Sequence, residues 1–240
     1  MSTTFRVGFS GDFLAADGSI GFGEIGIDRL TANPGIEVEF LAESPRELRP
    51  DHLQGFDAVA LLSPRVTARS LAGVERLVLI ARFGVGYDNV DIDACSERGV
   101  LVATTPEATR TPMATTVLTL ILALSHRLME KDRLIRSGRW AEKRNLMGYG
   151  LTGRTLGSIG LGTIGREILS LTRPLKMRHI AFDPYVPPTV GSELGLDLVD
   201  LDTLIGRSDY ITINCALTSE TFHLIDARRI GLMKSTAFLI

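Results

Sequence analysis

The stretch TLGSIGLGTIGREIL, residues 155–169, decides the fold of this chain. Its apolar run leads into Gly160, Gly162 and Gly165, which form the pattern G-x-G-x-x-G at the turn from a strand into a helix. Gly160 would permit the tight turn, Gly162 would let a pyrophosphate approach the backbone, and Gly165 would allow close packing of helix on strand. The first helical turn would hold the phosphates through its N–H groups. The stretch therefore predicts a dinucleotide-binding turn; a glycine-rich turn that binds nothing is the alternative.

An acidic residue follows at the distance that such a turn requires. Asp183 lies eighteen residues past Gly165, at the end of the apolar run HIAF. A carboxylate there can accept both ribose hydroxyls of an adenosine, and its charge would repel a 2′-phosphate. The next residues, Pro184-Tyr185-Val186, offer no arginine to reverse that preference. We therefore expect NAD rather than NADP as cofactor; a turn-forming aspartate before proline is the alternative.

Short apolar runs alternate with helical patterns along the whole chain, which is typical of parallel sheets covered by helices. The first half shows five such runs, at 5–9, 38–41, 58–62, 77–81 and 100–103. Helices are expected between them, at 24–32, 45–53, 67–72 and 92–98. Thr104-Thr105-Pro106 then interrupts the pattern, because the residue before a proline avoids the helical conformation. We expect an α/β fold with one domain at 1–104 and a second at 105–240.

The second half begins with a long helix, expected at 113–137, whose apolar side is broad enough to pack on a domain or a partner subunit. Strands are then expected at 155–160, 179–182, 196–199, 210–214 and 237–240, with helices at 164–171 and 201–205. The last expected strand ends at Ile240. In α/β proteins such a strand is followed by a loop and a covering helix, so we expect the sequence to be incomplete at its C-terminus.

Composition excludes several classes of function. The 240 residues are 45% hydrophobic and 22% charged, with a formal net charge of −2, which leaves no basic field for nucleic acid. The N-terminus lacks the pattern of a signal peptide, and the most apolar stretch, 117–124, is too short to span a bilayer. Cys95 and Cys215 have no metal-ligand spacing. We expect a cytoplasmic protein with no membrane partner and no metal site.

Five motifs now resemble one family: RFGVGYDNVD, GRTLGSIGLGTIGREI, AFDPY, SDYITINCALTSET and MKSTAFLI, in this order and spacing. The chain resembles the D-isomer-specific 2-hydroxyacid dehydrogenases, which include phosphoglycerate, glyoxylate and hydroxypyruvate enzymes. The resemblance implies a flavodoxin-like substrate domain and a Rossmann-type, doubly wound NAD-binding domain. It implies hydride transfer between NAD(H) and a small 2-keto or 2-hydroxy acid, by an enzyme that is a homodimer when complete.

The resemblance also assigns cofactor contacts to individual residues. Thr163 and Ile164 would touch the pyrophosphate, Cys215 would lie near the nicotinamide half, and Thr221 would contact the cofactor.

Substrate contacts are expected in the loop 82–91. The resemblance places its backbone N–H groups against the substrate carboxylate, with Val85 near the nicotinamide. The residues agree, because Gly84 and Gly86 free the backbone around Val85 to present consecutive donors to an anion. A plain glycine turn is the alternative. Arg65 could clamp an anionic substituent of the substrate; a solvated surface arginine is an equal alternative.

Catalysis needs a cation that polarises the substrate and a proton donor for the developing alkoxide. The family supplies an arginine from an Asn-Thr-Ala-Arg-Gly loop directly after the AFLI strand, and a histidine paired with a glutamate further on. All three would lie beyond Ile240, and we regard none of the four histidines as a replacement. We expect the 240 residues to be inactive alone. A dinucleotide-binding module or regulator without turnover and a non-functional gene fragment are the alternatives.

Overall fold

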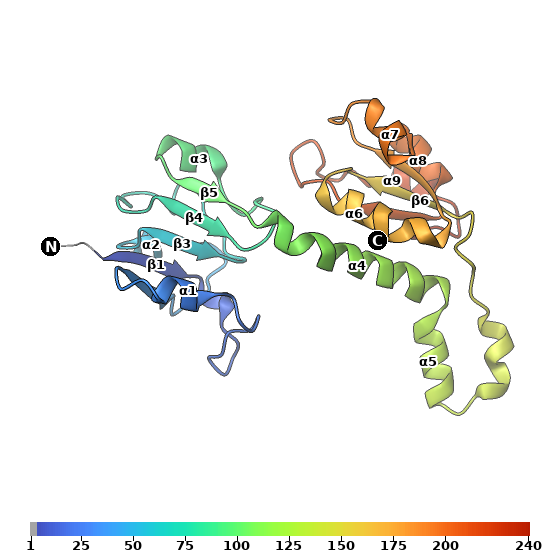
Figure 1. Cartoon of the computed structure of the whole chain (residues 1–240), viewed down its shortest axis with the longest axis horizontal. Helices are drawn as coiled ribbons and strands as arrows, with labels where there is room; N and C mark the ends of the chain where they lie inside the picture. Colours follow the sequence, from blue (N-terminus) through green and yellow to red (C-terminus); the bar gives the residue numbers. More distant parts are fainter. Residues whose placement is uncertain (1–3) are drawn as a thin grey trace. The chain divides into compact units, whose positions relative to one another are not determined.

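The computed structural model describes residues 4–240. These residues form two compact units, of which the first ends at Pro106 and the second runs from Glu107 to Ile240 (Figure 1). Each unit has one five-stranded sheet, and all the strand pairs are parallel. The expected α/β class is therefore confirmed.

The first unit has the strand order β2-β1-β3-β4-β5. This is the flavodoxin-like order, in which loops at the carboxyl ends of the strands meet at one edge of the sheet. The strands are β1 Phe5–Phe9, β2 Ile36–Phe40, β3 Ala58–Leu61, β4 Leu79–Arg82 and β5 Leu101–Ala103. The helices are η1 Gly11–Phe13, α1 Ile27–Thr31, α2 Pro50–Leu53 and α3 Ile92–Glu97.

Three helical expectations for the first unit need correction. The segment 67–72 forms a series of turns rather than a helix, and the Ser70 hydroxyl accepts the N–H of Thr67 at 3.0 Å. The helices expected at 24–32 and 45–53 are shorter than the pattern suggested, at Ile27–Thr31 and Pro50–Leu53. Buried side chains of β3 and β4, including Val59, Leu61 and Ile80, nonetheless form one continuous core with the surrounding segments.

The second unit has the strand order β10-β9-β6-β7-β8. Its strands are β6 Thr155–Ile159, β7 Arg178–Phe182, β8 Asp197–Leu198, β9 Tyr210–Ile213 and β10 Phe238–Leu239. Its sheet is flanked by α6 Thr163–Thr172, η3 Arg173–Leu175, α7 Thr189–Leu194, α8 Leu201–Arg207 and α9 Ala227–Leu232. Chain order reverses at β6, which pairs with β7 on one side and β9 on the other. In doubly wound sheets the carboxyl ends of the strands at such a point form the ligand crevice.

The long helix expected at 113–137 is two helices, α4 Pro106–Ser125 and α5 Leu128–Arg136. They are separated at His126-Arg127, where Arg127 has the left-handed φ of 51°. The buried face of α4, with Ala114, Val117 and Ile121, packs on the core of the second unit. The chain then continues through α5 into η2 Trp140–Leu146, which contacts α5 (Figure 1).

Among residues 4–240, no single helix has both the length and the apolar character needed to cross a membrane. Helices α4 and α5 reach those limits only when they are counted together, and they are bent by 59° with respect to each other.

Candidate cofactor and substrate sites

The glycine turn between β6 and α6 has the geometry that its spacing predicted. Gly160 has a φ of 91°, and a Cβ atom there would lie 2.8 Å from the backbone nitrogen of Cys215. A Cβ atom on Gly165 would lie 2.5 Å from the carbonyl oxygen of Gly160, so helix α6 packs directly on the turn. A Cβ atom on Gly162, in contrast, would meet nothing within 4 Å. The turn is therefore tightly packed against protein atoms at Gly160 and Gly165 and open to solvent or a ligand at Gly162.

Asp183 joins this turn to the end of β7. Its Oδ2 atom accepts the backbone N–H of Leu161 at 2.8 Å, and its Oδ1 atom accepts the N–H of Tyr185 at 3.0 Å. Each carboxylate oxygen keeps a further lone pair that can accept a hydroxyl. Because β6 and β7 pair in register up to Ile159 and Phe182, the carboxylate lies where the two strands end together.

A short chain of polar side chains supports the turn from beneath. The buried Ser158 hydroxyl donates to the carbonyl oxygen of Gly160 at 2.8 Å. The Asn214 amide donates to Ser158 Oγ at 3.0 Å, and Thr212 Oγ1 donates to Asn214 Oδ1 at 3.3 Å. The bonds connect β6 to β9 and hold the carbonyl of Gly160 in one orientation.

A cavity of about 400 Å³ opens in front of these elements. It brings together five of the eight predicted cofactor residues: Gly160, Gly162, Asp183, Cys215 and Thr221. The other three, Thr163, Ile164 and Gly165, belong to the first turn of α6 and do not line the cavity. Phosphate contacts from that turn would run through backbone N–H groups, which have no acceptor within the helix.

The two remaining side chains on the β9 side of the cavity differ in character. Burial raises the pKa of the Cys215 thiol, and the charge of Asp183 raises it further, so the thiol stays protonated and presents an apolar surface. Thr221 Oγ1 donates to the carbonyl of Ala216 at 2.6 Å and accepts the N–H of Thr218 at 2.8 Å. The Thr221 hydroxyl thus shapes its own loop at the cavity wall.

The predicted substrate loop follows β4 in the first unit. Gly84 has a φ of 144°, and its N–H already donates to Thr105 Oγ1 at 2.9 Å. Over residues 4–240, the N–H groups of Val85 and Gly86 have no hydrogen-bond acceptor. The consecutive donors available to an anion are therefore those of Val85 and Gly86, and Gly84 serves to orient them.

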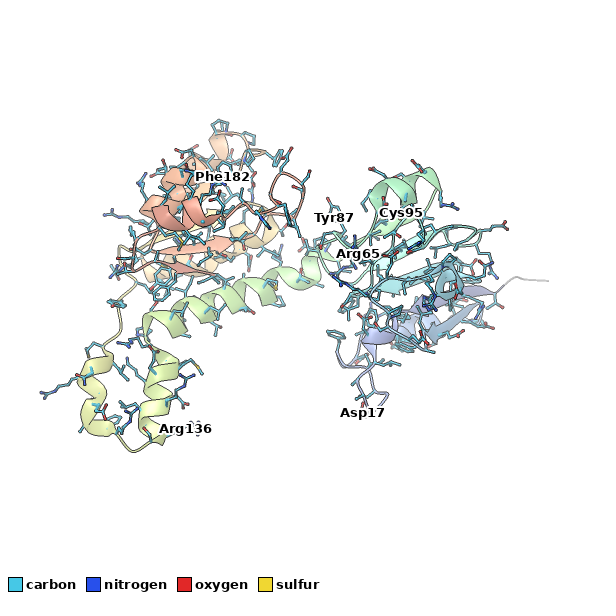
Figure 2. The ribbon with its side chains drawn as sticks, turned by 180° about the vertical axis from the view of Figure 1, so that it is seen from behind. Asp17, Arg65, Tyr87, Cys95, Arg136 and Phe182 are labelled. Carbon is cyan, nitrogen blue, oxygen red and sulfur yellow. The ribbon has the colours of Figure 1, made fainter. Side chains whose placement is uncertain are left out.

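Arg65 belongs to a neighbouring loop after β3, which also ends at this edge of the sheet (Figure 2). Its guanidinium is exposed, and its backbone N–H donates to the carbonyl of Arg46. The loop is held from both sides, because Asp12 accepts the N–H of Ser63 at 2.9 Å and Asn89 donates to the carbonyl of Pro64 at 2.9 Å. Asn89 itself belongs to the loop 82–91, so its bonds to the carbonyls of Pro64 and Leu62 connect the two predicted substrate loops.

Sequence reasoning missed three residues with polar groups at these sites. Arg82, at the end of β4, donates to the carbonyl of Phe83, and its buried Nε atom has no acceptor among the described residues. Tyr185 and Glu220 both line the cofactor cavity, and the tyrosine hydroxyl donates to Glu220 at 2.7 Å. Arg82 could have been found from the sequence, because it is a basic residue directly before the glycine-containing loop. Tyr185 and Glu220 lie 35 residues apart, and nothing local predicts their contact.

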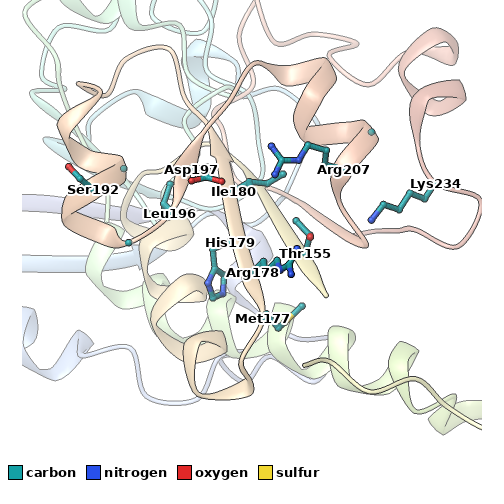
Figure 3. Close-up of a pocket in the computed structure, with 13 residues that line it drawn as sticks. Thr155, Met177, Arg178, His179, Ile180, Ser192, Leu196, Asp197, Arg207 and Lys234 are labelled. Carbon is teal, nitrogen blue, oxygen red and sulfur yellow. The ribbon is translucent and has the colours of Figure 1, made fainter. Parts of the chain in front are cut away.

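A second, larger cavity of about 730 Å³ lies at the opposite edge of the same sheet. Figure 3 shows that its wall includes Thr155, Arg178 and Asp197, which are the first residues of β6, β7 and β8. The residue that caps the C-terminus of α7, Gly195, and the last residue of α8, Arg207, also line it, and helix C-termini carry partial negative charge. The cavity of about 400 Å³ lies at the carboxyl ends of the strands and is called the carboxyl-edge cavity below. It fits a dinucleotide better, because it alone of the two includes the glycine turn.

Comparison with known proteins agrees with this geometry. Residues 118–240 match the model of the D-isomer specific 2-hydroxyacid dehydrogenase, NAD binding domain. The match contains all eight predicted cofactor residues and the whole of the second sheet.

Similar proteins cover both units. A glyoxylate reductase of Thermococcus onnurineus is 36% identical over 226 residues, which are 90% of this chain and 67% of that protein. A D-3-phosphoglycerate dehydrogenase of Archaeoglobus fulgidus is 34% identical over 218 residues, 90% of this chain and 41% of that protein. The crystal structure of the TT0316 protein from Thermus thermophilus superposes with a TM-score of 0.81 at 28% identity, covering 98% of this chain and 72% of that one.

The chain thus spans about two thirds of the first relative and about two fifths of the second. Its fold, its glycine turn and its sequence agree, and the chain belongs to the D-isomer-specific 2-hydroxyacid dehydrogenase family, whose NAD-binding domain it carries.

Proposed function

We propose that this chain binds NAD(H) in the cavity between Gly160 and Asp183 and takes part in hydride transfer to or from a small 2-keto or 2-hydroxy acid. The bond between Asp183 and the N–H of Leu161 is the observation that carries the proposal, because it fixes a carboxylate beside the phosphate-binding turn. The adenosine ribose would bond to Asp183, and the pyrophosphate would lie against the open face of Gly162. NAD supplies the hydride chemistry when it is bound.

The substrate would be held by its carboxylate. In this proposal the N–H groups of Val85 and Gly86 donate to the two carboxylate oxygens, in the way that backbone nests bind anions. Arg65 would add a cation for a substituent at the far end of the substrate. The names of the relatives support glyoxylate or a phosphorylated hydroxy acid as the substrate class. The guanidinium of Arg65 would favour the phosphorylated class.

We further propose that these 240 residues do not turn over substrate without an additional arginine and proton donor. The placement of the four histidines supports this. His52 bonds to Arg49, His179 lies at the amino edge of the second sheet, and His126 follows the end of α4. Burial lowers the pKa of His179, which also bonds to Thr172. His223 stacks on Phe222 in the loop after β9 and does not line the cofactor cavity.

We propose, in addition, that the protein is a cytoplasmic homodimer. Large apolar side chains stand exposed along α4 and α5, and such patches often mark protein interfaces. They are Leu120, Leu124, Leu128, Met129 and Ile135. Light scattering during gel filtration would measure the mass, and a monomer at tens of micromolar concentration would contradict a stable dimer of this chain.

Two measurements test the proposed function. Titration of NADH, followed by the change in nucleotide fluorescence, should show saturable binding. A coupled assay of NADH oxidation with glyoxylate, hydroxypyruvate and phosphohydroxypyruvate should show no turnover by the 240 residues alone. Binding without turnover would also suit a regulatory dinucleotide-binding module, so the assay is repeated after fusion of a catalytic segment from a relative. Turnover by the fusion would favour the dehydrogenase, and none would favour the module.

A further inference from the structure

Two carboxylates line the cofactor cavity. Asp183 lies on the β7 side and Glu220 on the loop after β9. Among the described residues that line this cavity, none is lysine, arginine or histidine. Arg166 is a cation on the adjoining glycine turn, where its Nε–H donates to the carbonyl of Leu161 at 2.9 Å, but it does not line the cavity. An additional phosphate on the ribose would therefore meet the negative charges of Asp183 and Glu220 at the cavity wall.

Tyr185 holds Glu220 in this position. The tyrosine hydroxyl donates to Glu220 Oε2 at 2.7 Å, and the N–H of the same residue donates to Asp183 Oδ1 at 3.0 Å. Tyr185 therefore links the two acidic residues across the mouth of the cavity. The hydrogen bond from the hydroxyl to Glu220 raises the pKa of Tyr185, and the charges of Glu220 and Asp183 raise it further. The phenol therefore remains a proton donor at neutral pH.

The loop that carries Glu220 is folded on itself. Thr218 and Thr221 lie on either side of Glu220 and form two reciprocal bonds, in which the N–H of each residue donates to the hydroxyl oxygen of the other. The N–H of Phe222 also donates to the carbonyl of Thr218 at 2.9 Å. A turn closed in this way restricts where the Glu220 carboxylate can go. The carboxylate is therefore directed to the cavity by its own loop as well as by Tyr185.

We propose that Glu220, held by Tyr185, is a second determinant of the preference for NAD over NADP. This inference rests on the proposed cofactor site and assigns Glu220 no bond to NAD. Glu220 would act by repulsion: the 2′-phosphate of NADP carries between one and two negative charges at neutral pH, whereas the ribose hydroxyl of NAD carries none. Exclusion of a wrong ligand by unfavourable charge is a common route to specificity.

The experiment measures the dissociation constants of NADH and NADPH for four proteins: wild type, Glu220→Gln, Tyr185→Phe and Glu193→Gln. Glutamine keeps the shape of Glu220 and can still accept the tyrosine hydroxyl. Glu193 is an exposed acid in α7 of the same unit and lies outside the cavity, so it is the matched control for net charge. Thermal midpoints confirm that each variant is folded.

Removal of the Glu220 charge should strengthen NADPH binding by roughly threefold to tenfold at low ionic strength and change NADH binding by less than about twofold. Tyr185→Phe should shift the ratio of the two constants in the same direction by a smaller factor, and Glu193→Gln should leave the ratio unchanged. The gain for NADPH should shrink as salt is added.

Two results would overturn the inference in different ways. If wild type binds NADH but Glu220→Gln leaves the NADPH to NADH ratio unchanged, Glu220 has no part in discrimination and the cofactor site stands. If wild type does not bind NADH, the proposed cofactor site is wrong, and the role of Glu220 is excluded with it. An equal gain in Glu193→Gln would assign the effect to net charge and would also overturn the role of Glu220.

Discussion

The Oδ2 atom of Asp183 lies 2.8 Å from the backbone nitrogen of Leu161, so the acidic residue after β7 is tied to the glycine turn after β6. The two segments meet because β6 and β7 are neighbouring parallel strands that end together. The proposed ribose and pyrophosphate positions are consequently fixed with respect to each other by a strand ladder, before any cofactor binds. Preorganisation of this kind reduces the ordering that binding requires.

Alanine at the first two glycines should separate folding from binding. Gly160→Ala places a side chain in a left-handed conformation and against the nitrogen of Cys215, so it should destabilise the second unit by about 1–3 kcal/mol and weaken NADH binding. Gly162→Ala meets no protein atom within 4 Å, so it should leave stability within about 0.5 kcal/mol. Its methyl group should nonetheless reduce NADH affinity at least tenfold. Urea unfolding and NADH titration of both variants check this; equal stability losses would contradict it.

Asn89 should keep the loop that carries Arg65, residues 62–66, ordered. Asn89→Ala removes the bonds to the carbonyls of Pro64 and Leu62, which should destabilise the first unit by about 1–2 kcal/mol. Hydrogen exchange, read by mass spectrometry, should speed up over residues 62–66. Asn33→Ala is the control, because Asn33 also bonds to backbone, at Gly35, but on an exposed turn. Unchanged exchange over 62–66 in Asn89→Ala would show that these bonds are unimportant.

Asp209 should make the second unit sensitive to acid. Burial raises the pKa of this carboxyl, but the N–H of Thr155 together with Lys234 and Arg154 lowers it by more, so the folded pKa lies below the ordinary value of 3.8. A lowered folded pKa means that the stabilisation is present above the ordinary pKa and is lost as pH falls through the folded one. Asp209→Asn should cost about 1–3 kcal/mol at pH 7.

The test for Asp209 is the free energy of unfolding, measured between pH 3 and pH 7 in wild type and Asp209→Asn. The two curves should approach each other only as pH falls below the ordinary pKa of 3.8, because the stabilisation by the charged carboxylate is lost as pH falls through the lowered folded pKa. Parallel curves over the whole range would mean that another carboxylate is responsible for the acid sensitivity.

Local signals in the sequence predicted the elements that depend on nearby residues. The turn of Gly160 and Gly165 was predictable because its requirements are local. Gly160 needs a left-handed φ, and Gly165 packs against the carbonyl oxygen of Gly160. The break after α4 was not, because Arg127 adopts a left-handed φ with neither glycine nor proline beside it. Helix α9 was also missed: it has only six residues, and its one start signal is the cap by Asp226, which accepts the N–H of Arg229.

The features of the candidate sites also divide into those that local sequence predicted and those that depend on the folded chain. Asp183 was predictable from its distance to the glycine motif, whereas its bond to Leu161 depends on the register of β6 with β7. The contact between Tyr185 and Glu220 joins loops that follow two different strands, and only the folded chain brings them together. The bond from the N–H of Gly84 to Thr105 Oγ1 was likewise beyond local prediction, because the two residues lie 21 positions apart in the sequence.

Titration of NADH into wild type, Asp183→Ala and Asp197→Ala decides whether the carboxyl-edge cavity binds the cofactor. Asp197 is a matched aspartate at the other edge of the same sheet, where it lines the larger cavity. Loss of charge-assisted bonds to the ribose, at about 1.5–3 kcal/mol each, should weaken NADH binding by Asp183→Ala more than tenfold. Asp197→Ala should bind like wild type. Unchanged affinity in Asp183→Ala, or an equal loss in Asp197→Ala, would show that NAD does not bind as proposed.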